Sequence, residues 1–226
     1  MPLPMVHLSV AEKMIGAGFP IKEQPQFYLG TLSPDAIHMR QDADRLAKNI
    51  THLLPAEKEK IHSWEDRNEG YYFEFVRDFI NTNQAKASTD FLMGYAIHIL
   101  TDMLWTKRVF SKFTEKFNMS DIFVQDKLKA YYHDTDIVDY QLCNESDWRS
   151  DVWQSLQGVA YSDFLNLLSA QEIKLWNERV LNFYDAPENQ YKFSGTPMYI
   201  TKPDIENFIS SCAETISDKM KAAGQA

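Results

Sequence analysis

The chain of 226 residues has few of the residues that form tight turns or cross-link small folds. Gly (8) and Pro (9) are scarce, which argues against an all-β sandwich with many tight turns. The two cysteines, Cys143 and Cys212, lie far apart and in no CxxC spacing, which excludes a zinc ribbon and fits a reducing compartment. The N-terminus also lacks the basic start and apolar segment of a signal peptide, so we expect a cytoplasmic protein.

Positive charge is also in short supply. Lys and Arg number 23 against 32 Asp and Glu, which gives a formal net charge of −9. This balance disfavours double-stranded nucleic acid or an anionic membrane as a partner. The main apolar run, residues 91–105, is shorter than the ~20 residues of a transmembrane helix, so we expect no transmembrane segment. A Gly-rich phosphate loop, a GxSxG elbow and an HExxH motif are missing too.

Helix signals dominate what is present. Ser9 with Glu12, and Ser169 with Glu172, form capping-box patterns. Apolar residues at 44% and charged residues at 24% are typical of a globular protein, and no repeat or composition break divides the chain. We therefore predict one all-α domain over residues 1–226, a bundle of about seven to nine helices around a buried central helix at residues 89–110. The C-terminal tail is expected to fray.

The predicted central helix, TDFLMGYAIHILTDMLWTKRVF, is hydrophobic on almost every side, as helices inside a protein are. His98 and Asp102 interrupt it, and their side chains project from one face, one turn apart. Burying an unpaired charge costs free energy, so each group needs a partner. A His–Asp hydrogen bond between helices and a bound metal ion would both supply one, and the pair alone leaves both alternatives open.

The histidines are confined to the earlier part of the chain, at positions 7, 38, 52, 62, 98 and 133. Histidine is the commonest transition-metal ligand, and carboxylates complete hydrolytic zinc sites. Ligands so far apart in sequence cannot form a zinc finger. They can meet only in a helical bundle in which each helix points one or two of them inward.

Four stretches carry a resemblance to a known family: PLPMVHLSVAEK, FYLGTLSPDAIHMR, KNITHL and DFLMGYAIHILTD. In that order they resemble the zinc-dependent phospholipase C family, whose superfamily includes the P1-type nucleases. The resemblance spans roughly residues 1–140, the metal-site half, while residues 141–226 are expected to add packing helices. It implies one zinc ion held by Asp35, His52, His98 and Asp102, and a second that shares Asp102 and takes His7.

The chain also departs from that family. It begins MPLPM, without the N-terminal Trp whose amino group is a ligand in secreted members, and the ligands of a third ion have no match. We therefore expect one or two Zn²⁺ ions, with Asp136 of the segment YYHDTDIVD, or alternatively Asp134, as the replacement ligand. Asp35 or Asp136 would orient the attacking water as the catalytic general base. His133 and Asp139 lie in the same segment without an assigned role.

The function that the resemblance implies is a metal-dependent phosphoester hydrolase, similar to phospholipase C, in which a metal-activated water attacks a small phosphoester or a phospholipid headgroup. The alternative is a non-catalytic metal-binding or helical interaction protein that retains a degenerate site. Each residue also has an ordinary interpretation. Asp35 follows Ser-Pro as helix-start residues do, His52 suits the edge of a core, and His7 lies near a terminus. Arg40 is expected to pair with Asp42 or Asp44 rather than with an anionic substrate.

Overall fold

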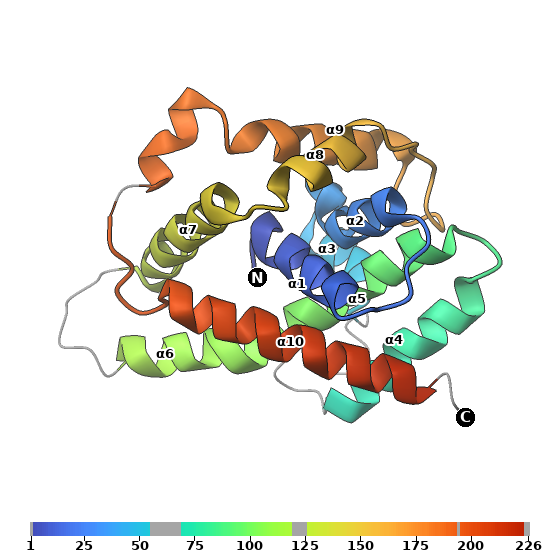
Figure 1. The fold of residues 1–226 in the computed structure, drawn as a ribbon, viewed down its shortest axis with the longest axis horizontal. Coiled ribbons are helices and arrows are strands. Elements are labelled where there is room, and N and C mark those ends of the chain that lie inside the picture. The colour runs from blue at the N-terminus through green and yellow to red at the C-terminus, as the bar shows by residue number, and fades with distance from the viewer. Residues whose placement is uncertain (1, 55–68, 119–125, 194, 224–226) are drawn as a thin grey trace.

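The computed structural model describes residues 2–118, except 55–68, and residues 126–223, except 194 (Figure 1). Over these residues the chain is all-α, as predicted. They form no β-strand, and their isolated antiparallel bridge joins Phe164 to Leu168. The helices are α1 (Pro4–Gly16), α2 (Gln24–Leu32), η1 (Ser33–Met39), α3 (Arg45–Thr51), α4 (Glu69–Asn83), α5 (Thr89–Trp105), η4 (Thr106–Phe110), α6 (Ser111–Asn118), α7 (Lys127–Glu145), α8 (Arg149–Gln157), α9 (Ala170–Phe183), η5 (Pro187–Phe193) and α10 (Lys202–Ala223). Within the described ranges, no helix is long and apolar enough to cross a membrane.

The predicted central helix forms the core of the bundle. In α5, every residue from Gly94 to Trp105 is buried, and α1, α2, α4 and α10 pack against it (Figure 1). The helix does not run unbroken to residue 110, because Thr106–Phe110 forms a π-helical turn before α6 continues. The Thr106 hydroxyl donates to the carbonyl of Asp102, and the Ser111 hydroxyl donates to the carbonyl of Thr106, so side chains compete for the backbone at this turn.

Two glycines allow α2 and α5 to cross in backbone contact. A Cβ atom at Gly30 would lie 2.1 Å from the carbonyl oxygen of Phe91, and one at Gly94 would lie 2.1 Å from that of Phe27. Any side chain would force the helices apart, since carbon and oxygen cannot approach so closely. The crossing brings the last turn of α2, including Thr31, against the face of α5 that carries His98.

Helix α1 is capped by another helix rather than by its own residues. Ser9 does not cap it as predicted, because the helix starts at Pro4, which supplies the fixed φ of a first turn. The buried carboxylate of Asp139 on α7 accepts a hydrogen bond from the Met5 amide at 3.1 Å, and the Tyr184 hydroxyl donates to it at 2.6 Å. Burial raises the pKa of Asp139 to about 7, although the Tyr184 hydrogen bond opposes that shift. The second predicted capping box, Ser169 with Glu172, is present at the start of α9.

Candidate metal centre

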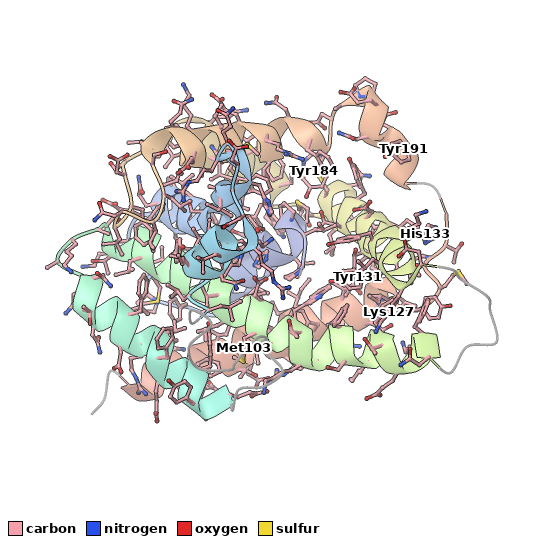
Figure 2. The ribbon with its side chains drawn as sticks, turned by 180° about the vertical axis from the view of Figure 1, so that it is seen from behind. Met103, Lys127, Tyr131, His133, Tyr184 and Tyr191 are labelled. Atoms are coloured by element: carbon pink, nitrogen blue, oxygen red, sulfur yellow. The ribbon has the colours of Figure 1, made fainter. Side chains whose placement is uncertain are left out.

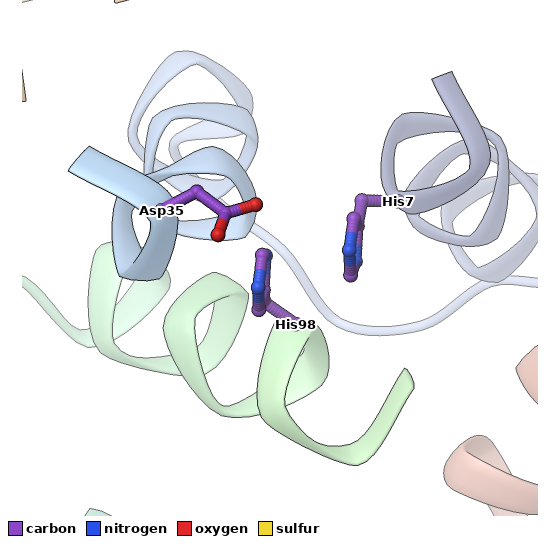
Figure 3. Close-up of side chains that lie close together, drawn as sticks. All are labelled: His7, Asp35 and His98. Atoms are coloured by element: carbon purple, nitrogen blue, oxygen red, sulfur yellow. The ribbon is translucent and has the colours of Figure 1, made fainter. Parts of the chain in front are cut away.

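Five of the six predicted metal ligands meet in the interior of the bundle. They are His7 from α1, Asp35 from η1, His52 at the C-terminal end of α3, and His98 and Asp102 from α5. All five are buried, and Asp35 is the most exposed of them at 8%. In Figure 3 the side chains of His7, Asp35 and His98 point toward one another from three separate helices. Segments distant in sequence therefore build one cluster.

The ligand atoms are close enough to share ions. Nε2 of His52 lies 3.3 Å from Oδ1 of Asp35 and 3.7 Å from Oδ2 of Asp102. Oδ2 of Asp102 is also 3.7 Å from Nε2 of His98, and its Oδ1 is 3.5 Å from Nε2 of His7. Two groups of three have one ligand atom from each residue, all within 4.8 Å of one another: His7, Asp35 and His98, and His52, His98 and Asp102. Zn²⁺ binds nitrogen and oxygen at about 2.0–2.2 Å, so ligand atoms at these separations suit such an ion.

Backbone carbonyls fix the orientation of two imidazoles. Nδ1 of His98 lies 2.8 Å from the carbonyl oxygen of Thr31, and Nδ1 of His52 lies 3.0 Å from that of Lys48. A carbonyl only accepts hydrogen bonds, so Nδ1 carries the proton in both rings, and the Nε2 lone pair of the neutral ring faces the cluster. This is how metal-binding histidines are usually held.

The cluster leaves many of its own polar atoms without partners. Seven buried side-chain atoms of the cluster have no hydrogen-bond partner among the described residues: Nδ1 and Nε2 of His7, Oδ1 of Asp35, Nε2 of His52, Nε2 of His98, and both carboxylate oxygens of Asp102. An unsatisfied buried group costs about 1–3 kcal/mol, and folded proteins contain few of them. The interhelical His–Asp hydrogen bond, the alternative open from the sequence, is not formed, because Nε2 of His98 and both carboxylate oxygens of Asp102 have no hydrogen-bond partner among the described residues. One nitrogen of His7 carries the proton of the neutral ring, but the other six atoms can accept without donating, and acceptors gathered at one point fit a cation.

Burial favours the neutral form of His7 and His98. Desolvation, together with the charge of the other imidazoles, holds the pKa of His7 well below its ordinary value and lowers that of His98. These two rings stack in parallel, with centroids 3.8 Å apart and planes 2° from coplanar, an arrangement that two imidazolium cations would oppose. Burial raises the pKa of Asp102 to about 6. Neutral imidazoles and carboxylates are the protonation states that bind metal.

The cluster approaches solvent on the side of Asp35. The side chain of Asp35 is 12% exposed, while those of its neighbours His38 and Lys48 are 45% and 32% exposed. Nζ of Lys48 lies 3.8 Å from Oδ1 of Asp35 and 3.0 Å from Nε2 of His38. Burial by itself would raise the pKa of Asp35, but the adjacent His38 and His52 outweigh it and hold that pKa well below its ordinary value. The ionised carboxylate of Asp35 and the side chain of Lys48 thus lie together where the metal centre is nearest to solvent, which we call its mouth.

Comparison with known proteins adds no relative. No family model matches the chain, and no curated protein or solved structure shows significant similarity to it. The likeness to zinc-dependent phospholipases C therefore rests on the quoted residues alone and stays a prediction.

The structure does not bring the sixth predicted ligand to the cluster. Asp136 lies on α7 near Asp139 and Tyr140, outside both groups of potential ligands in the described chain. Its alternative, Asp134, is committed elsewhere, because its carboxylate accepts the backbone amides of residues 198–200 at 2.6–3.0 Å and contacts Nδ1 of His133. In Figure 2, His133 lies on α7 at the periphery. His62 falls outside the described residues.

Sequence reasoning missed Lys48, whose position one helical turn before His52 was an available signal. It also missed Trp176 of α9. The ring of Trp176 lies 5.8 Å from that of His38, and its Nε1 is buried without a hydrogen-bond partner among the described residues. Arg40 pairs with Glu172 at 2.6 Å rather than with Asp42 or Asp44, and so it ties η1 to α9 instead of facing the site.

Proposed function

We propose that the protein is a metal-dependent phosphoester hydrolase with one or two Zn²⁺ ions, similar in its site to phospholipase C. The observation that carries the proposal is the set of seven buried, unpartnered ligand atoms on five residues. His52, His98 and Asp102 would hold one ion. A second would be held by His7 and Asp35 with the other carboxylate oxygen of Asp102, since Nε2 of His98 has one lone pair and can bind only one ion. Three imidazoles and two carboxylates are a typical hydrolytic zinc set.

A bound zinc ion would supply Lewis acidity toward a phosphoryl oxygen and lower the pKa of a water molecule. The chain supplies positioning and charge. Asp35 is the ligand nearest solvent, and its depressed pKa keeps it ionised, so it can orient the attacking water by accepting a hydrogen bond from it. Lys48 beside it offers an ammonium group to a non-bridging phosphoryl oxygen. The substrate class that fits is a small phosphoester or a phospholipid headgroup.

Metal content tests the first half of the proposal. Elemental analysis of protein purified without added metal should find at least about one equivalent of zinc, and His98→Ala should lose most of it. His133→Ala is the matched control, since His133 is half exposed and lies outside the cluster. Less than about half an equivalent in the wild type, unchanged by His98→Ala, would exclude the metal centre.

Turnover tests the second half. Bis-p-nitrophenyl phosphate, a short-chain phosphatidylcholine and single-stranded nucleic acid are the substrates, each with added Zn²⁺. Hydrolysis that Asp102→Asn abolishes and His133→Ala leaves intact supports the enzyme.

Burial favours a second candidate, a protein that keeps the metal for structure or binding. Four of the five cluster residues are no more than 1% exposed, whereas catalytic zinc sites keep a position open to substrate. Stable metal binding with no turnover of any of the three substrates would select this alternative.

A further inference from the structure

A cleft of about 440 Å³ lies between η4, α6 and α10, and none of the metal-centre residues lines it. Its lining consists of Lys107, Arg108, Val109, Lys112, Phe113, Lys116, Tyr199, Ile200, Asp204, Asn207, Phe208 and Ser211. This volume is in the range of small-molecule sites, about 300–1,000 Å³, and too small for a folded partner.

The charge of the cleft is opposite to that of the molecule. Four cationic side chains line it against a single acidic one, Asp204, while the whole chain carries a formal net charge of −9. Lys112 and Lys116 lie four residues apart on α6, at a step of about 6 Å, and Arg108 precedes Lys112 by four residues in the π-helical turn η4, so the three form a row along the cleft. Like charges at this spacing destabilise a helix, so local energetics do not account for the row.

The π-helical turn adds a fourth cation to the row. In a π-helical turn the backbone hydrogen bonds join residues five apart, so Lys107 and Lys112 lie on the same side. In a regular α-helix these two lysines would lie on different faces. Both lysines line the cleft. Irregular turns of this kind occur frequently at functional sites.

Arg108 and Lys116 are held by partners within the protein, whereas Lys112 between them is open to a ligand. Arg108 donates to the Thr215 hydroxyl at 3.1 Å and lies 3.7 Å from Glu69, while Lys116 donates to the Tyr199 carbonyl at 2.9 Å and lies 3.5 Å from Asp204. Lys112 is exposed and has no hydrogen-bond or ion-pair partner among the described residues. A ligand with negative charge would therefore find its first free partner at Lys112.

The floor of the cleft strengthens these charges. Phe113, Tyr199 and Phe208 beneath the row are buried and aromatic, and such low-dielectric walls focus the field of the cations above them. Asn207 and Ser211 on α10 add hydrogen-bonding groups on the opposite wall.

We propose that this cleft binds a small polyanion carrying at least two phosphate groups, such as a di- or triphosphate. Two or more anionic groups match a row of cations with a free centre, and their binding would offset the repulsion within the row. The assignment does not depend on the metal centre or on hydrolysis.

Inorganic pyrophosphate is the probe, titrated calorimetrically into full-length protein in EDTA so that the metal centre cannot capture it. We expect saturable binding that weakens as NaCl rises from about 0.05 to 0.5 M, because salt screens exposed charges. Lys112→Gln should weaken it by about fivefold to tenfold, equivalent to about 1 kcal/mol. The control Lys129→Gln, on the exposed face of α7, should bind as the wild type does.

Two results would overturn the proposal. One is the absence of binding up to about 1 mM pyrophosphate. The other is binding that survives Lys112→Gln but is lost in Lys48→Gln, since that pattern places the anion at the mouth of the metal centre instead. The Lys112 substitution lies at an exposed helix position, so the variant should fold, and its melting temperature in EDTA verifies this.

Discussion

The buried carboxylate of Asp102 allows the metal centre to be tested without any assay of turnover. Asp102 is fully buried, and both of its oxygens lack hydrogen-bond partners in the described structure. Without a cation the folded protein must bury a charge that nothing neutralises. Asp102→Asn removes the charge and keeps the shape, so in EDTA the variant should be at least as stable as the wild type.

In the presence of zinc, the wild type should be the more stable of the two proteins. A ligand that binds only the folded state at 100 times its dissociation constant adds about 2.7 kcal/mol to the free energy of unfolding. For a chain of this length 1 kcal/mol corresponds to about 2–4 °C, so the wild type should melt about 5–10 °C higher in zinc than in EDTA. Asp102→Asn loses the carboxylate placed near all three histidines, and its shift should fall to less than about a quarter of that value.

The assay is thermal unfolding by circular dichroism, with both proteins in EDTA and in excess Zn²⁺. The reasoning fails if zinc shifts both proteins equally, because Asp102 is then no ligand. It also fails if Asp102→Asn in EDTA is less stable by about 3–5 kcal/mol, the cost of breaking a buried ion pair. That result would mean that protonated histidines, rather than a metal, neutralise Asp102.

Three further predictions concern Gly94, Asp139 and Lys48. Gly94→Ala should destabilise the protein by at least about 3 kcal/mol in denaturant unfolding, because its Cβ would lie 2.1 Å from a carbonyl oxygen, whereas Gly158→Ala, with open space around it, should be nearly neutral. Asp139 has a folded-state pKa of about 7 against an ordinary value of 3.8, so it binds its proton more tightly when folded, and stability should fall as pH rises from about 4 to 7 by up to about 4 kcal/mol. Asp139→Asn should flatten that slope, and an unchanged slope would assign it to other groups. If the protein hydrolyses phosphodiesters, Lys48→Gln should raise KM or lower kcat by at least about tenfold without loss of zinc, while loss of zinc would make the Lys48 side chain a support of Asp35 instead.

The sequence predicted the all-α class and the core position of the central helix, because apolar periodicity depends on burial alone. It also placed His98 and Asp102 on one face, since that follows from helix geometry. The convergence of His7, Asp35 and His52 on that face depended on the family resemblance, because contacts between distant segments have no local signal. Sequence patterns could not predict which backbone carbonyls orient His52 and His98.

The differences between sequence and structure have physical causes. Asp136 was chosen by residue type, and the structure places it outside both groups of potential ligands, while Asp139, one turn further on in α7, reaches inward to α1. That contact also explains why Ser9 does not start a helix, since a carboxylate from elsewhere in the chain can cap α1 five residues earlier. The π-helical turn after Trp105 was not foreseen, because Thr106 and Ser111 compete for the backbone through contacts that hydrophobic patterning does not encode.

The backbone contact between α2 and α5 has a consequence for the position of His98. With glycine on both sides, no side chain between these helices can repack, so the distance from the Thr31 carbonyl to His98 has almost no freedom to adjust. Two glycines that belong to neither group of potential ligands thus fix the position from which His98 offers Nε2 to an ion.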